Sequence, residues 1–174
     1  GLAYTSFGGD ILQIEATRFT GKGRLVLTGQ LGDVMKESAS IALDYVRTHA
    51  NEFKIDPKLF EENDVHIHVP EGAVPKDGPS AGVTMTTALV SCFSNIPVKA
   101  NLAMTGEVTL RGNVLPIGGL KEKSLAAHRS GIDTILIPKE NVKDLDDVPQ
   151  EVKDAVTFIP CSNVSQVLHN ALVK

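Results

Sequence analysis

The feature that most constrains this chain is a glycine- and proline-rich segment, Glu71–Gly82, which separates an extended run from a helical one. Before it, Asp64–Pro70 alternates polar and apolar residues and is rich in β-branched side chains, which predicts a strand that ends at the proline. After it, Ala81–Phe93 carries apolar residues at helical spacing, which predicts a helix whose first turn lies near Ser80. We therefore expect a rigid loop that leads from a strand into a helix.

This arrangement suits a reactive group at Ser80. The N–H groups at a helix start lack intrahelical partners, and the helix dipole places partial positive charge there. An oxyanion that forms beside the serine hydroxyl could use both. The ordinary role of a serine at this point is helix capping. However, five Gly and Pro residues within eleven positions, from Gly72 to Gly82, bend and stiffen the backbone more than a cap requires. Ser80 is therefore our candidate nucleophile.

Phosphate binding is a second functional interpretation of the same segment. A glycine-rich turn into a helix is a common way to hold phosphate groups, and Gly78–Gly82 has that general form. The chain has no Gly-x-x-x-x-Gly-Lys-Ser/Thr sequence. In addition, Pro79 lacks one of the N–H groups that such a loop would use. Phosphate binding is thus the weaker interpretation.

A serine hydroxyl needs a base within hydrogen-bond reach to act as a nucleophile. Among the histidines, His66 and His68 fall on one face of their predicted strand, where a structural role is the simpler interpretation. His128 and His169 lie on predicted helices, with no carboxylate that the sequence marks as an orienting partner. A Ser-His-Asp triad is left open but has no support in the sequence.

Lysine is the other candidate base, provided that burial lowers its pKa toward neutrality. The predicted helix Leu120–Ser130 contains Lys121 and Lys123. At about 100° per residue, Lys123 falls on the same stripe as Ala126 and Ala127, whereas Lys121 falls on the polar side. A lysine between alanines can extend to solvent. The Gly-Gly turn before this helix and the unexplained serine favour a desolvated Lys123 as the base.

The rest of the sequence predicts a single compact domain of the α/β (α+β) class. A chain of 174 residues with 42% hydrophobic and 22% charged residues suits one soluble globular domain. Short turns occur beside helical crossovers, which favours a mixed β-sheet with flanking helices. Near the N-terminus, Asp10–Thr17 and Arg24–Thr28 are predicted strands joined as a hairpin across Gly21–Gly23. A helix is predicted from Gly32 to near Asn51.

Charge and cysteine content limit the kinds of partner and the cellular compartment that we expect for this chain. The net charge is −4 and no run of Lys and Arg stands out, so there is no nucleic-acid footprint. There is also no long apolar span or signal peptide. Cys92 and Cys161 provide neither a disulfide framework nor metal-ligand spacing, so we expect a reducing compartment. Because Gly1 is not a natural start residue, we expect the chain to be a fragment of a longer protein.

Three blocks, in order along the chain, carry a resemblance to a known family: Pro75–Gly82, Ala103–Glu107 and Leu115–Lys123. They resemble the signature sequences of the proteolytic domain of Lon, the ATP-dependent protease, in its soluble bacterial and organellar type. The resemblance covers essentially the whole chain. It implies a Lon proteolytic-domain fold over residues 1–174, with the upstream ATPase and N-terminal domains absent from this fragment. One departure is Tyr4, where the family usually has Trp.

The resemblance implies a serine endopeptidase with a Ser-Lys dyad. Ser80 falls on the family's nucleophile and Lys123 on its general base, the same lysine that the helix-face argument selects. Thr105 falls on a threonine thought to orient the lysine. Asp77 falls on an acidic residue of the catalytic loop whose position is linked to active and inactive states. No cofactor or metal is implied for this fragment, since ATP and magnesium belong to the upstream ATPase domain.

The resemblance also implies partners and a location. Substrates would be unfolded, damaged or regulatory proteins, and assembly would be a hexameric ring that serves protein quality control. The expected location is the cytoplasm, or an organellar matrix if the source is eukaryotic. The alternative is a catalytically silent binding or assembly module on the same fold. A small-molecule phosphotransferase is a weaker third hypothesis.

Overall fold

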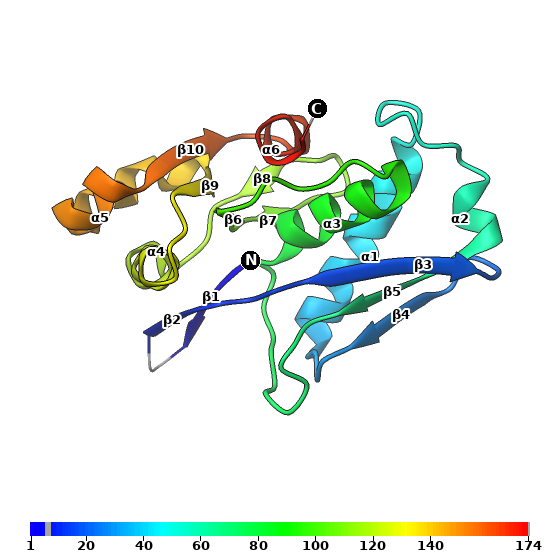
Figure 1. Ribbon diagram of the computed structural model, residues 1–174, viewed down its shortest axis with the longest axis horizontal. Coiled ribbons are helices and arrows are strands. Elements are labelled where there is room, and N and C mark those ends of the chain that lie inside the picture. Colours follow the sequence, from blue (N-terminus) through cyan, green and yellow to red (C-terminus); the bar gives the residue numbers. More distant parts are fainter. Residues whose placement is uncertain (6–7, 174) are drawn as a thin grey trace.

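The computed structural model describes residues 1–5 and 8–173 and confirms an α+β fold (Figure 1). The strands of this described part form two three-stranded sheets and two smaller two-stranded ribbons. The elements follow one another as β1 (Leu2–Thr5), β2 (Gly8–Ile11), β3 (Glu15–Thr20), β4 (Leu25–Thr28), α1 (Asp33–Thr48), α2 (Leu59–Glu62), β5 (Asn63–His68), α3 (Gly82–Ser94), β6 (Leu102–Met104), β7 (Glu107–Val108), β8 (Val114–Leu115), α4 (Leu120–Arg129), β9 (Thr134–Pro138), the 3₁₀ helix η1 (Lys139–Asp147), α5 (Gln150–Ala155), β10 (Thr157–Cys161) and α6 (Val164–Ala171).

The first sheet has the strand order β3-β5-β4 and is mixed, as predicted. Strand β5 is antiparallel to β3 and parallel to β4. The predicted strand Asp10–Thr17 is divided between the end of β2 and the start of β3. Its predicted hairpin with the strand now seen as β4 is also wrong, because β5 lies between β3 and β4. The physical reason is burial: Val65 and Ile67 of β5 are almost fully buried, whereas β3 alternates exposed and half-buried residues. The more apolar strand occupies the centre of the sheet, although it comes later in the chain.

Helices α1 and α3 pack against each other and share one hydrophobic core with the first sheet (Figure 1). In α1 the buried stripe includes Met35, Ala39, Ala42 and Val46, at the helical spacing expected from the sequence. Helix α3 is buried along most of its length. Both predicted helices are confirmed. No helix in the described part of the chain combines the length and the apolar character needed to cross a membrane.

The second sheet has the order β10-β9-β6, and its strands are parallel. Its central strand β9 contains Ile135, Leu136 and Ile137, which are at most 1% exposed. A continuous apolar run of this kind is expected for a parallel strand covered on both faces. Helix α4 packs beside this sheet and also against the β1–β2 ribbon. The segment that joins β6 to β7 donates hydrogen bonds in two directions, from the Thr105 N–H to Leu136 of β9 and from the Gly106 N–H to Ser80.

Replacing Ile67 with Ala should destabilise the chain, because this side chain is fully buried in the central strand β5. We expect a loss of about 2–5 kcal/mol in the free energy of unfolding. Leu110→Ala is the control, since Leu110 is 60% exposed and should change stability by no more than about 0.5 kcal/mol. Urea unfolding measures both. Equal losses would contradict the placement of β5 at the centre of the core.

Candidate active site

Ser80 lies in the turn that leads into α3. The N-cap of α3 is Ala81, and no side chain caps this helix. Ser80 therefore does not have the capping role that a serine at this point would ordinarily have. Its carbonyl accepts a hydrogen bond from the Gly106 N–H at 2.9 Å, and the Val83 N–H donates to the Gly106 carbonyl at 3.1 Å. These two bonds hold the helix start against the turn that follows β6.

Lys123 is buried on the inner face of α4, with only 3% of its surface exposed, whereas Lys121 is exposed. Its stripe also contains the buried Ala126 and Ala127, so the helix-face prediction is confirmed. The Nζ atom of Lys123 donates a hydrogen bond to Thr105 Oγ1 at 3.4 Å. Desolvation lowers the pKa of Lys123 to about 8. An appreciable fraction of the amine is therefore neutral near physiological pH.

The β1–β2 ribbon packs against helix α4. At Gly9 in β2 the backbone approaches α4 so closely that an added Cβ would lie 2.1 Å from the Glu122 carbonyl oxygen. Only glycine permits this approach. The ribbon thus contacts the backbone of α4 one residue before Lys123. The side chain of Tyr4, on the neighbouring strand β1, lies outside the part of the structure that is described.

Thr105 and Gly106 connect the two candidate residues. Thr105 is 1% exposed, and its hydroxyl accepts the hydrogen bond from Lys123, while the next residue, Gly106, binds the backbone of Ser80. The structure thus brings Ser80, Lys123 and Thr105 to one turn. Within the described residues, Lys123 Nζ donates its hydrogen bond to Thr105 Oγ1 and not to Ser80 Oγ. Contacts between a nucleophile and its base commonly tighten only when substrate is bound.

Asp77 is directed to a different element, the start of α1. Its Oδ1 atom accepts hydrogen bonds from the N–H groups of Met35 and Gly78, both at 2.9 Å. These hydrogen bonds, that of Met35 first, hold the pKa of Asp77 below its usual value. Asp77 therefore fastens the loop that carries Ser80 to α1.

Sequence reasoning missed the role of Lys76. Its ammonium donates hydrogen bonds to the carbonyls of Gly29 at 2.9 Å and Val74 at 2.7 Å, and to that of Glu71. A loop without regular secondary structure leaves carbonyl groups in need of donors. A charged donor inside the glycine- and proline-rich segment was the signal available in the sequence.

His66, His68 and His128 have partners away from the Ser80 turn. His66 Nε2 and His68 Nδ1 both lie within hydrogen-bond distance of Thr28 Oγ1, at 2.8 and 2.6 Å. His128 Nε2 lies 3.8 Å from a carboxylate oxygen of Glu151. Neither arrangement builds a Ser-His-Asp triad. Within residues 1–5 and 8–173, no group of three or more His, Cys, Asp and Glu side chains is placed to hold a metal ion.

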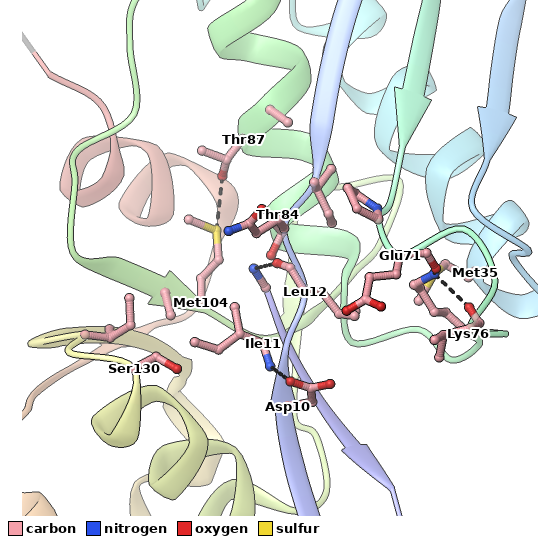
Figure 2. Close-up of a pocket in the computed structure, with 18 of the residues that line it drawn as sticks. Asp10, Ile11, Leu12, Met35, Glu71, Lys76, Thr84, Thr87, Met104 and Ser130 are labelled. Carbon is pink, nitrogen blue, oxygen red and sulfur yellow. Dashed lines mark hydrogen bonds between the residues drawn. The ribbon is translucent and has the colours of Figure 1, made fainter.

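A groove of about 830 Å³ adjoins the site (Figure 2). Ser80 and Lys123 do not line it, but Asp77, Thr84 and Met104 do, and each of these is close in sequence to a candidate residue. Figure 2 shows Thr87 of α3 beside Met104 of β6, and the Thr87 hydroxyl donates a hydrogen bond to the Met104 sulfur at 3.4 Å. Many of the further lining residues are apolar, among them Ile11, Leu12, Ile14, Val74, Leu102 and Ile132, and the polar ones include Asp10, Gln13, Glu71, Lys76 and Ser130. The groove thus offers apolar surface for side chains together with polar and charged groups.

Comparison with known proteins identifies the family of the chain. The family described as the Lon protease (S16) C-terminal proteolytic domain matches the chain over residues 1–174. The chain is 60% identical over 174 residues to the Lon protease of Brevibacillus choshinensis, covering 100% of this chain and 22% of that protein. It is 62% identical over 173 residues to the Lon protease of Bacillus thuringiensis (strain Al Hakam), covering 99% of this chain and 22% of the relative. It is 59% identical over 173 residues to Lon protease 1 of Bacillus subtilis (strain 168), covering 99% of this chain and 22% of that relative.

The fold and the family match together define a peptidase domain. The chain belongs to the Lon protease (S16) family, as its C-terminal proteolytic domain. It spans about a fifth of the length of the relatives named above.

Burial of Lys123 should make stability depend on pH in one direction. The pKa of Lys123 is about 8 in the folded chain and 10.5 without burial, so between these values the unfolded state binds more protons and stability rises with pH. Below about pH 8 the penalty of burying the charge is complete and amounts to up to about 3 kcal/mol. Lys123→Met removes this penalty.

The stability advantage of Lys123→Met over the unsubstituted chain should therefore be largest below pH 8 and shrink toward pH 10.5. Urea unfolding of the two chains across this range measures the difference, and Lys121→Met is the matched control on the exposed side of α4. A pH-independent difference would mean that the folded chain does not shift the pKa of Lys123.

Proposed function

We propose that this chain is a serine endopeptidase that uses Ser80 as nucleophile and Lys123 as general base. The observation that carries the proposal is the burial of Lys123 beside the Thr105–Gly106 turn that also binds the backbone of Ser80. Its desolvated amine, with a pKa of about 8, can lose its proton near neutral pH. A silent assembly module would have no use for a lysine buried at this cost.

The chemistry is acyl transfer. Neutral Lys123 takes the proton of the Ser80 hydroxyl as Oγ attacks the carbonyl carbon of the scissile peptide bond. N–H groups at the start of α3 stabilise the oxyanion, where the helix dipole is also favourable. As the C–N bond breaks, the ammonium of Lys123 returns a proton to the leaving amine. Water, deprotonated by the same lysine, then hydrolyses the acyl-enzyme ester and restores Ser80.

Thr105 acts in this scheme as a positioning residue. Its hydroxyl accepts a hydrogen bond from Lys123 Nζ at 3.4 Å and is itself buried at the end of β6. This contact fixes the direction of a side chain that otherwise has four rotatable bonds. Asp77 has a second positioning role, through its hydrogen bond to α1.

The substrate in this proposal is an extended polypeptide. Within the described residues, β6 pairs with β9 on one side only, and Leu102 to Met104 line the groove beside the site. An extended peptide can add to a free strand edge and place alternate side chains in apolar pockets. A folded protein cannot present such a strand, so the substrates are unfolded, damaged or regulatory proteins.

Several further features of this proposal belong to a larger protein, since the chain covers 22% of its relatives. Unfolding would be supplied by an upstream ATPase domain with ATP and magnesium. The assembly would be a hexameric ring that acts in protein quality control in the cytoplasm, or in an organellar matrix in a eukaryote.

Labelling with a fluorophosphonate tests the dyad, because a serine that forms a bond to phosphorus and expels fluoride gains a defined mass. We expect one adduct, at Ser80, whose rate of formation rises with pH through about 8 as Lys123 loses its proton. Lys123→Ala should slow labelling by about 100-fold or more, since general bases contribute at least that factor. Intact-mass spectrometry and peptide mapping give the rates and the position.

Two controls make the result decisive. Ser80→Ala should abolish the adduct, and Lys121→Ala should leave its rate within about twofold, because Lys121 is exposed on the other side of α4. An adduct retained in Ser80→Ala would place the nucleophile elsewhere. Equal losses for the two lysine variants would contradict the role assigned to Lys123.

A further inference from the structure

The loop that carries Ser80 is docked on the turn before α1 by its backbone. Residues Leu31 and Lys76 form an isolated parallel bridge. In it, the Lys76 N–H donates to the Gln30 carbonyl at 3.0 Å, and the Gly32 N–H donates to the Lys76 carbonyl at 2.7 Å. The side chain of Lys76 adds hydrogen bonds to three further carbonyls, from the loop itself and from Gly29. Figure 2 shows Glu71 and Lys76 of this loop next to Met35 of α1.

Asp77 caps α1 from outside the helix. A capping side chain normally belongs to the N-cap residue and accepts the N–H of the second or third helical residue. The N-cap of α1 is Gly32, which has no side chain to do this. The third helical residue is Met35, and its N–H donates at 2.9 Å to Asp77, which is 42 positions away in the sequence. The carboxylate of the loop thus replaces the missing cap.

The space that this carboxylate occupies exists because residue 32 is glycine. A Cβ added at Gly32 would lie 2.3 Å from both Cγ and Oδ2 of Asp77, well inside van der Waals contact. The carboxylate would have to leave its position over the helix start. By contrast, a Cβ added at Gly72, in the same loop, would meet nothing within 4 Å. The two glycines therefore form a matched pair for experiment.

Asp77 and Ser80 are joined by a short segment, so a displacement of Asp77 is transmitted to Ser80. Only Gly78 and Pro79 separate the two residues, and the Gly78 N–H is bound to the same carboxylate oxygen. On the far side, the Ser80 carbonyl is held by Gly106 at 2.9 Å. The segment is thus fastened at both ends, and release of one end leaves the direction of Ser80 less well determined.

We propose that Gly32 is a positioning residue for the reaction at Ser80: it leaves room for Asp77 to cap α1, and this cap aligns the short segment that carries the nucleophile. The inference rests on the proposed function of Ser80. The bond from the Lys76 N–H to Gln30 and the bonds of the Lys76 side chain involve neither Gly32 nor Asp77, so we expect the loop to stay docked when the cap is lost.

Gly32→Ala in the 174-residue chain tests this, with Gly72→Ala as control. Fluorophosphonate labelling of Ser80 should slow by about tenfold or more in Gly32→Ala, because misplacement of a reacting group by about 1 Å can cost 100-fold. Gly72→Ala should stay within about twofold. Amide exchange at Met35, followed by NMR, should be faster in Gly32→Ala and unchanged in Gly72→Ala. Unchanged labelling in Gly32→Ala would overturn the inference, whatever the exchange shows.

A double-variant cycle tests whether Gly32 acts through Asp77. Asp77→Ala alone should slow labelling and speed Met35 exchange, and Gly32→Ala added to it should change neither rate by more than about twofold, because the clashing carboxylate is gone. Additive losses would overturn the inference.

If Gly32→Ala does not fold, Asp77→Ala must still slow labelling and speed Met35 exchange. Unchanged labelling in Asp77→Ala overturns the inference. Failure of the unsubstituted chain to label at Ser80 overturns the proposed function instead, and Met35 exchange still reports on the cap.

Discussion

The candidate site is arranged around the burial of one lysine amine. Lys123 is 3% exposed, and its Nζ atom donates a hydrogen bond to Thr105 Oγ1. Removing a charge from water without an opposite charge beside it is unfavourable, and the chain meets this by lowering the pKa of the lysine to about 8. A fold that only needed a stable core would place an apolar residue there. In the proposed dyad, the same burial is what makes Lys123 available as a base near neutral pH.

The second constraint is that a loop without regular structure must find partners for its backbone N–H and C=O groups. In the segment between β5 and α3, polar side chains bind several of these groups. Lys76 binds carbonyls, and Asp77 binds the N–H groups of Met35 and Gly78. Buried or half-buried backbone groups need partners, and a loop must find them in side chains. The same bonds that satisfy the backbone also connect the loop to α1.

Local periodicity predicted the elements well and their pairing poorly. The helices α1, α3 and α4 and the strands β5 and β9 were found from spacing and composition, because their apolar faces are continuous. The hairpin expected between β3 and β4 is wrong, since β5 pairs with both. A glycine-rich turn between two extended runs is compatible with a hairpin and equally with two strands separated by a third. Which arrangement forms is decided by burial of Val65 and Ile67, which are distant in sequence from the turn.

Local patterns and helix geometry were enough to predict the α+β class, the family resemblance and the choice of Lys123 over Lys121. Three further features are visible only in the folded chain: Ser80 is not a helix cap, Thr105 and Gly106 join Lys123 to the Ser80 turn, and Asp77 caps α1 across 42 positions. These contacts link residues far apart in the chain. Periodicity records which face of an element is buried, but it carries no information about which distant backbone group will lie against it.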